Sequence, residues 1–511
     1  MIMTPNTISA EVVQGNLFFT VPDTTLAAIV DESTKICLRF PEILKKIKND
    51  QDRIGLQDKQ LRLEQKQWIE KQTPVFSNFD YPESCPVAAH LDQGRPRMKP
   101  EIVLTFLIIN EYFQSIYSKE AVERLMDSMT IYSFLAQHNV KMPGHRTIGD
   151  NVNAISADTR RFIMECQLAV IQEEQLDDFS TLVGDSTAVA ADTRWPTDSG
   201  LIHRLLGRAF RTGRKLESFG LENVRIHWMN QWLPRLKSQD FKINNAKRKR
   251  TRNKEYHKLL EIANKAIWHL ADEAKRLYPK KLSAPVSPMM RYRLNKNWDQ
   301  FIGDLCDACR VYEHCRVRIK SGKTPPAAER VFSLSDCSAA YISKGDREPV
   351  IGYRPQLARS GKGFISALLI PEGNRPDSKM LVPLVEEAEA LTGVLPSIAN
   401  FDDGYSSRPE YNILKAKGIE LVSFSGSKGK KIIGDDLWEQ DAYCDARRMR
   451  SAVESLMFCL KYGHGFGQLR RRGIEAVRQS LIGKAIVYNL LRMILIRKQK
   501  AQEKTTVAAA A

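Results

Sequence analysis

Three acidic residues of the chain stand in settings that suit metal-dependent phosphodiester chemistry. Asp185 lies in the β-branched segment 180–189, which predicts a strand, Asp402 ends a later predicted strand, and Glu454 lies on a predicted helix. Two strand-borne acids and one helix-borne acid can converge at one end of an α/β sheet, where their oxygens would bind two Mg²⁺ or Mn²⁺ ions. Such a pair of ions suits water cutting a nucleic-acid strand and equally a 3′-hydroxyl joining one.

Spacing alone does not single out these acids, because the chain has 60 Asp and Glu residues. Asp192 and Asp198 are rivals of Asp185, although both lie beyond the predicted strand. A strand-end aspartate such as Asp402 is also often a simple turn or cap residue.

Two other motifs are weaker. Gly322, Lys323 and Thr324 resemble the end of a phosphate loop, but the earlier glycine of that motif is replaced by Val317. A second group, Cys306, Cys309, His314 and Cys315, has spacing that zinc ligands can have, yet apolar residues and cysteines recur there at intervals of three and four. That recurrence favours a buried helix face over a zinc site.

The charge of the chain favours a nucleic-acid partner. It carries 77 Lys and Arg against 60 Asp and Glu, a net charge of +17, and its last 91 residues hold 17 basic and 8 acidic residues. The densest basic run includes Lys247, Arg248, Lys249 and Arg250. We expect this run to contact phosphates, although such a run is often only a solvated segment, and a basic but ordinary enzyme would share the composition.

Neither a membrane span nor a secretion signal is expected. The longest apolar stretch near the C-terminus, residues 485–496, is shorter than the roughly 20 residues that a membrane-spanning helix needs. The first residues lack the basic and apolar regions of a signal peptide. The nine cysteines are an odd number in a long chain, so we expect reduced thiols and a cytoplasmic location.

Two helical regions are expected before the α/β core. Residues 1–93 contain a polar helix whose half-filled heptad leaves dimerisation as one interpretation and a solvated edge helix as the other. Residues 94–176 form a DNA-binding helical module, with helices at 100–113 and 118–137 and a third opened by a capping box at Thr147. A plain helical bundle fits the same signals as a helix-turn-helix.

Strands and helices then alternate, which predicts an α/β core at 177–195 and 327–465. Strands are expected within 330–371, at 397–402 and at 418–424, and helices at 377–391, 408–417 and 446–462. A helical basic domain at 196–326 interrupts this core, and a basic C-terminal helix and tail occupy 466–511.

Three blocks of residues resemble bacterial insertion-sequence transposases of the DDE class, particularly the ISNCY-type and its neighbours, over residues 94–500. The first block, 184–202, begins Gly-Asp-Ser-Thr and ends Pro-Thr-Asp-Ser-Gly-Leu-Ile, as in the segment around the family's first catalytic aspartate. The second, 400–407, is similar to the family's Asp-x-Gly-Tyr turn and selects Asp402 over Asp403. Adjacent strand residues face opposite ways, so only one of these two can point into a site.

The third block is similar to the signature Tyr-x-x-Arg-x-x-x-Glu-x-x-x-x-x-x-Lys of related transposases. Arg450, Glu454 and Lys461 match it and would lie on one helix face. Arg447 stands in place of the signature's tyrosine, and the nearest tyrosine is Tyr443, so the resemblance does not extend to a hairpin intermediate.

The resemblance implies an RNase H-like α/β core in which Asp185, Asp402 and Glu454 hold two Mg²⁺ ions. Arg450, Lys461, Arg447 and the basic run 247–250 would bind DNA. The implied activity is cleavage at element ends and 3′-hydroxyl transfer into target DNA, with the terminal repeats and target as double-stranded partners. A homodimer or larger synaptic complex at the bacterial nucleoid is also implied. A nuclease without strand transfer and a non-catalytic DNA-binding remnant are the alternatives.

Overall fold

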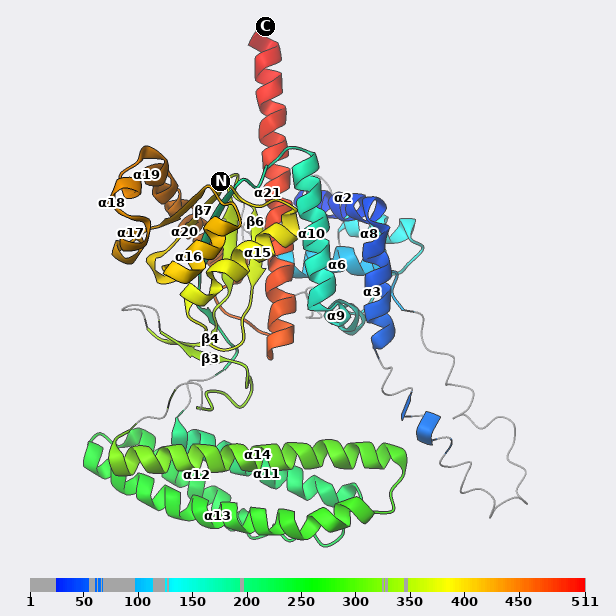
Figure 1. Ribbon diagram of the computed structural model, residues 1–511. Helices are drawn as coiled ribbons and strands as arrows, with labels where there is room; N and C mark the ends of the chain where they lie inside the picture. Colours follow the sequence, from blue (N-terminus) through cyan, green and yellow to red (C-terminus); the bar gives the residue numbers. More distant parts are fainter. Residues whose placement is uncertain are drawn as a thin grey trace, which may run out of the picture. The chain divides into compact units, whose positions relative to one another are not determined.

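The computed structural model describes the chain in two compact units (Figure 1). Unit 1 comprises Met1–Ile54, Pro96–Asp192 and Ser338–Ala511, and unit 2 comprises Gly55–Arg95 and Thr193–Cys337. The residues that the structure describes are 24–54, 60–61, 63–65, 67, 97–113, 125, 128–193, 197–323, 326, 330–343 and 348–510. The domain boundaries expected from the sequence stay predictions, although the helical interval 196–326 falls within unit 2.

A mixed five-stranded sheet forms the centre of unit 1, as the α/β class predicts. Its order is β6-β5-β1-β7-β8, with β1 antiparallel to β5, β5 antiparallel to β6, and β1, β7 and β8 mutually parallel. All five strands are short and mostly buried on both faces, which explains their nearly continuous apolar sequences. They span Thr181–Ser186 (β1), Gln356–Ser360 (β5), Ile365–Leu369 (β6), Ile398–Phe401 (β7) and Leu421–Phe424 (β8).

Unit 1 also contains a smaller antiparallel sheet of three strands. Its order is β2-β4-β3, formed by Val189–Ala190, Val350–Tyr353 and Ala340–Ile342. Of the strands expected within 330–371, the apolar stretch 330–334 is not a strand, so that prediction is wrong. Its Ser333 hydroxyl instead accepts backbone N–H groups of Ser335 and Asp336, which is a local turn that competes with strand pairing.

Helices follow the strands of the main sheet. Asp377–Met380 (η3) and Leu381–Thr392 (α15) precede β7, while Asp403–Tyr405 (η4) and Arg408–Ala416 (α16) lie between β7 and β8. After β8 come Ser427–Ile433 (α17), Asp435–Trp438 (α18), Asp441–Arg448 (α19) and Arg450–Gly463 (α20). The prediction of a single helix at 446–462 is therefore wrong about where the helix starts, because the chain turns between α19 and α20.

The remaining helices of unit 1 form a bundle in which α2, α6 and α10 contact the long C-terminal helix. Contacts join α10 and α6 to α21, α3 to α6, and α10 to α15 (Figure 1). These helices are Thr24–Arg39 (α2), Pro41–Arg53 (α3), Pro100–Tyr112 (α6), Met129–Gln137 (α8), His145–Ala154 (α9), Ala157–Glu173 (α10) and Ile474–Ala510 (α21). Ile47 of α3 is the first apolar position of the predicted heptad. Its side chain is fully buried, so it belongs to the core of unit 1.

The helix expected from a capping box at Thr147 begins earlier, at His145. Its N-cap is Gly144, so the predicted capping box is wrong. Ser156 supplies the side-chain cap instead, because its hydroxyl accepts the Thr159 N–H at the start of α10. Of the helix expected at 118–137, residues 118–124, 126 and 127 lie outside the described residues, and its described end is α8.

Helix α21 is bound to its neighbours by polar contacts as well as apolar packing. The segment Ile474–Glu503 is long and apolar enough to cross a membrane by composition, but 72% of its most apolar window is buried inside the structure. Asn489 exchanges hydrogen bonds with the backbone of Ile365 on β6, and Gln167 of α10 donates to the Ile486 carbonyl. These contacts describe a core helix of unit 1.

Unit 2 is built from helices around its own apolar core. The helices Asp198–Ser218 (α11), Met229–Asn245 (α12), Lys249–Ser283 (α13) and Pro288–Ser321 (α14) contact one another along their lengths. Phe301, Leu270 and Leu236 are among the fully buried members of this core. The helical character expected for 196–326 is thus confirmed for its described residues.

Candidate active site

The strand register places Asp185 and Asp402 at the same edge of the main sheet. Gly184 of β1 pairs with Phe401 of β7 in parallel register, so the next residues of the two strands are Asp185 and Asp402. The carboxyl ends of parallel neighbours meet at one sheet edge. Two aspartates that are 217 positions apart in the sequence are thereby brought side by side.

The pleat directs both aspartates toward the same face. Gly184 and Phe401 face α15, because a Cβ on Gly184 would lie 2.4 Å from the Phe401 ring and 3.1 Å from Leu384. Alternation turns the following residues to the opposite face. There Asn400, two residues before Asp402, donates to the Ala446 carbonyl of α19. The sequence therefore needs glycine at 184 so that the Phe401 ring can fill the face away from the acids.

Helix α20 completes the cluster by bringing Arg450 and Glu454 to this edge. Arg450 Nη2 lies 3.8 Å from Asp185 Oδ2 and 3.3 Å from Asp402 Oδ1. Arg450 Nη1 donates to Glu454 Oε1 at 3.0 Å. All three predicted acids thus contact one guanidinium, and the two aspartate oxygens are no more than about 7 Å apart because both contact the same nitrogen. We call these four residues the carboxylate cluster.

The carboxylate cluster runs from the interior to the surface. The exposed fraction of the side chain is 8% for Asp185, 29% for Asp402 and 61% for Glu454. Asp185 Oδ1 accepts the Ser186 N–H, and Asp402 Oδ1 accepts the hydroxyl of Ser425, the residue that follows β8. Within the cluster itself, three carboxylates share one guanidinium.

Asp403 points away from the carboxylate cluster. Its Oδ1 accepts the Gly429 N–H of α17 at 2.9 Å and the Ser406 hydroxyl at 3.1 Å. The structure therefore uses Asp403 to hold the turn and α17, whereas Asp402 contacts Arg450. This is the division between neighbouring residues that the strand pleat predicts.

Tyr405 fixes the turn that follows Asp402. Its side chain is fully buried, and its hydroxyl donates to Gln356 Oε1 on β5. Burial raises the pKa of this hydroxyl well above its ordinary value, and the nearby Asp377 and Asp185 carboxylates add to the effect. Tyr405 therefore stays protonated and remains a hydrogen-bond donor beneath the cluster.

The two other cations of the helix signature occupy different surroundings. Lys461 lies two turns beyond Glu454 on the same face of α20 and is partly exposed. Arg447 belongs to α19, where its guanidinium lies 4.0 Å above the ring of Trp438 and donates to Cys444 Sγ. The structure brings Arg450 to the acids, and it places Arg447 in a cation–π contact.

Two aromatic residues next to the cluster have no counterpart in the sequence-based prediction. Phe458 and Tyr462 follow Glu454 at intervals of four residues on α20, with 66% and 74% of their surfaces exposed. Their ring centroids lie 4.5 Å apart. The four-residue spacing of Arg450, Glu454, Phe458 and Tyr462 predicts that these side chains form one ridge along a helix. The spacing does not predict that the two rings are exposed.

The predicted phosphate-contacting run lies in unit 2, at the beginning of α13. Lys247, Arg248, Lys249 and Arg250 are all exposed. Arg248 is the N-cap of α13, whose first turn contains no acidic residue. Cations at a helix N-terminus oppose the helix dipole, so this arrangement gives no internal electrostatic stabilisation and leaves the charges available to an anionic partner.

The rival acids and the cysteine motif have other contacts. Asp192 pairs with Arg472 at 2.9 Å, and Asp198 of unit 2 pairs with Arg318 at 2.5 Å. Cys315 is fully buried, and burial raises the pKa of its thiol to about 12, whereas Cys306, nine residues earlier on α14, is exposed. Nine residues correspond to two and a half helical turns, so these two thiols face opposite sides of the helix.

The carboxylate cluster has the donor type of a divalent-cation site but not its spacing. Asp185, Asp402 and Glu454 offer carboxylate oxygens, which Mg²⁺ and Mn²⁺ prefer. Within the described part of the chain, no three His, Cys, Asp or Glu side chains lie close enough together to hold a metal ion, and the Arg450 guanidinium lies between the three acids instead. Arg450 Nε is also buried, with no hydrogen-bond partner among the described residues.

Comparison with protein-family models, curated proteins and solved structures finds no match to this chain.

Proposed function

We propose that the protein is a DNA transposase whose carboxylate cluster performs metal-dependent strand cleavage and 3′-hydroxyl strand transfer. The observation that carries this proposal is the meeting of Asp185, Asp402 and Glu454 at one guanidinium, from three segments that are far apart in the sequence. The same three acids are the ones that the sequence resemblance selects. The alternative pairings of acids that the sequence left open, Asp192 and Asp198, have other partners.

The architecture supports an RNase H-like core. That resemblance requires a mixed sheet with one acid on a central strand and the next at the end of its parallel neighbour. Here β1 is the central strand of five, and β7 is its parallel neighbour. The third acid lies on α20, which contacts β1.

The residues of the cluster have distinct roles in this proposal. Asp185, Asp402 and Glu454 would hold two Mg²⁺ or Mn²⁺ ions, which, when bound, supply charge stabilisation and an activated oxygen nucleophile for phosphodiester chemistry. Asp185 is fixed by burial and by the Ser186 N–H, while the exposed Glu454 lies where a DNA strand can approach. Arg450 and Lys461 would position phosphates, since guanidinium and ammonium groups bind phosphate oxygens.

Phe458 and Tyr462 suggest how the DNA end is held near the cluster. They extend the Arg450–Glu454 ridge by two turns and present an exposed pair of rings whose planes are tilted by 42°. An unpaired base can stack on such a surface with about 1 to 3 kcal/mol of stabilisation. We assign them to the binding of a distorted or single-stranded end.

The proposed partners are the double-stranded terminal repeats of the element and its target DNA. The net charge of +17 and the exposed cations at 247–250 support polyanion binding. Joining two ends requires a homodimer or a larger synaptic complex, and a bacterial cytoplasm at the nucleoid is the corresponding location. Arg447 lies against Trp438, so we assign it a supporting contact beside the DNA path.

A strand-transfer assay with pre-nicked element ends and labelled target DNA tests this function. We expect joined product in the presence of Mg²⁺ or Mn²⁺ and none after chelation. Cleavage of ends without joining would identify a nuclease, and DNA binding without cleavage in the wild type would identify a non-catalytic DNA-binding protein. The DNA that borders the reading frame on both sides supplies the ends to test.

A further inference from the structure

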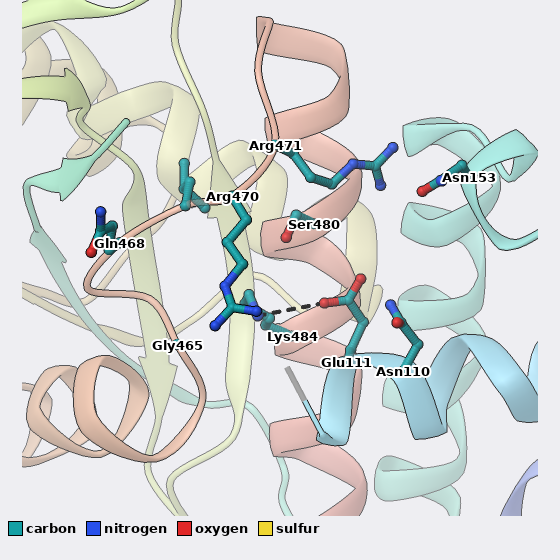
Figure 2. A pocket seen from close by; sticks show the side chains of 10 residues that line it. Asn110, Glu111, Asn153, Gly465, Gln468, Arg470, Arg471, Ser480 and Lys484 are labelled. Atoms are coloured by element: carbon teal, nitrogen blue, oxygen red, sulfur yellow. Dashed lines mark ion pairs between the residues drawn. The ribbon is translucent and has the colours of Figure 1, made fainter. Parts of the chain in front are cut away.

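A cavity of about 230 Å³ lies in unit 1 and is lined mostly by polar residues, none of which belongs to the carboxylate cluster (Figure 2). The loop before α21 contributes Arg470 and Arg471, and α21 itself contributes Ser480 and Lys484. The end of α6 contributes Asn110 and Glu111. One water molecule needs only about 10 to 15 Å³ of such space, so the cavity can hold a polyatomic anion together with its waters.

The charges that line the cavity are strongly unbalanced. Three cations, Arg470, Arg471 and Lys484, face a single acid, Glu111. Glu111 is itself shared, because its Oε1 accepts a hydrogen bond from Arg160 at 3.1 Å while its Oε2 lies 3.5 Å from Lys484 Nζ (Figure 2). The lining therefore carries an excess of two positive charges before the fully buried Arg160 is counted.

Two of the three cationic donors of the cavity, Lys484 and Arg471, are held in place by the surrounding structure, whereas Arg470 is exposed. Lys484 is only 6% exposed, and Arg471 Nη2 donates to Gln479 Oε1 at 2.8 Å. Arg471 Nη1 is buried, with no hydrogen-bond partner among the described residues. Buried cationic donors that lack an acceptor are costly, and an anion in the cavity would satisfy them.

The combination of donors selects a phosphate group over a carboxylate. Arginine guanidinium groups, a lysine ammonium group, a serine hydroxyl and side-chain amides are the groups that proteins use for phosphate oxygens. A phosphate monoester carries about −1.5 to −2 charges at pH 7, which matches the positive excess, whereas a carboxylate carries only one. We propose that this cavity binds a phosphate monoester, either the 5′-phosphate of a DNA end or a free phosphate compound.

The cavity is connected to β2, which follows shortly after the strand β1 that carries Asp185. Gln468, on its lining, bridges to Ala190 of β2, and the Leu469 N–H donates to the Ala190 carbonyl at 2.8 Å. Ala190 is five residues beyond Asp185, which limits their Cα separation to about 18 Å. A DNA end is therefore a natural source of the phosphate, and only this source rests on the proposed function.

Binding measurements on the full chain test the proposal. Isothermal titration would compare inorganic phosphate, a 5′-phosphorylated oligonucleotide and the same oligonucleotide with a 5′-hydroxyl. We expect at least one phosphorylated ligand to bind, and its affinity to fall about tenfold or more in Arg471→Gln and in Arg470→Gln. Preference for the phosphorylated oligonucleotide identifies the DNA end as the source, and binding of inorganic phosphate with equal affinity identifies a free phosphate compound.

Arg472→Gln is the matched control, because Arg472 is the next residue of the same loop, is exposed and pairs with Asp192 outside the cavity. Its phosphate affinity should stay within about twofold of the wild type. Equal losses in Arg471→Gln and Arg472→Gln, or no loss in either cavity variant, would overturn the site. Divalent-cation binding by the carboxylate cluster is measured in the same variants and should be unchanged, so failure of one proposal is separable from failure of the other.

Discussion

At the residue scale, Arg450 is the group that connects the acids of the carboxylate cluster. Its guanidinium contacts Asp185, Asp402 and Glu454 together and so offsets part of the repulsion among the three carboxylates. The same contacts put Arg450 in competition with any divalent cation for these oxygens. A cation that binds must displace at least part of the guanidinium, which would then be free to contact phosphate.

Replacing Arg450 separates these two effects. In Arg450→Gln the competing positive charge is lost, so Mn²⁺ should bind about tenfold more tightly, a difference of about 1.4 kcal/mol. DNA cleavage should nevertheless fall, because the phosphate-positioning charge is also lost. Titration of Mn²⁺ by electron paramagnetic resonance measures the affinity, and weaker Mn²⁺ binding would show that Arg450 instead builds the site.

The adjacent pair Asp402 and Asp403 gives a matched test of the proposed catalytic role. Asp402→Asn should lower the rate of DNA cleavage by more than about 100-fold, beyond the loss typical of residues that only support metal ligands. Asp403→Asn should keep the rate within a few-fold, because Asp403 contacts α17 and the turn at Ser406. Cleavage of a labelled element end measures both rates, and equal losses would contradict the assignment.

Phe458 and Tyr462 should contribute to DNA binding through stacking alone. The double variant Phe458→Ala and Tyr462→Ala should weaken binding of a single-stranded end by about tenfold or more, at 1 to 3 kcal/mol per stacked base. Fully paired DNA should bind nearly as before. Fluorescence anisotropy with both substrates measures the difference, and equal weakening of both would argue against stacking.

At the element scale, the structure shows why some elements were predictable and others were not. Strand β1 and strands β7 and β8 are short β-branched or apolar runs bounded by turn residues, so their existence and order follow from pattern. The proximity of Asp185 and Asp402 follows from the strand order, because the ends of parallel neighbours coincide, but their selection among the 60 acids rested on the family resemblance. The strand predicted at 330–334 fails because Ser333 bonds its own backbone.

Features that depend on contacts between distant segments were beyond the sequence. Arg447 was predicted to bind DNA, but nothing in its spacing reveals the Trp438 ring nine residues earlier. The burial of Arg160 likewise depends on α6 and α21, where a Cβ on Gly483 would lie 2.8 Å from Glu111 and 2.9 Å from Arg160. Glycine at 483 therefore allows α21 to lie close to the ion pair between Arg160 and Glu111. No local sequence pattern predicts this close approach.

His464, in the connection between α20 and α21, makes the stability of the folded chain depend on pH. Burial, assisted by the charge of Lys484, lowers the pKa of His464 from 6.5 to about 4. Between these values the unfolded chain takes up a proton that the folded chain excludes, so stability is full above pH 6.5 and falls as the pH drops toward 4. The loss is up to about 1.4 kcal/mol per pH unit.

His464→Phe should remove this contribution while keeping a ring against Tyr488, whose centroid lies 5.6 Å away. The thermal midpoint of the wild type should fall more than that of the variant between pH 7.5 and pH 5.5. Differential scanning fluorimetry at both pH values measures the two shifts. Identical shifts in the two proteins would contradict the assignment to His464.

At the scale of the whole molecule, the chain divides its proposed tasks between two units. Unit 1 holds the carboxylate cluster and the phosphate cavity, and unit 2 holds the exposed basic run on an independent apolar core. The sequence predicted the helical insertion from its periodicity, since a helical core needs only local pattern. It did not predict the cavity, which forms only where α6, α9 and α21 converge.

Neutralising Lys247, Arg248, Lys249 and Arg250 to Gln tests the role of unit 2. DNA affinity should fall about equally for all sequences, and the log–log slope of affinity against salt should flatten by roughly 0.9 per lost phosphate contact. The four side chains are exposed, so thermal stability should be unchanged. A salt slope equal to that of the wild type would exclude this run from the DNA interface.

The central claim is that three distant acids act together as one cation site. Mn²⁺ titration of the wild type and of Asp185→Asn, Asp402→Asn and Glu454→Gln tests it most directly, with Asp403→Asn as control. We predict that each of the three variants loses at least tenfold in Mn²⁺ affinity while the control keeps the wild-type value. Unchanged affinity in any one of the three would contradict the claim.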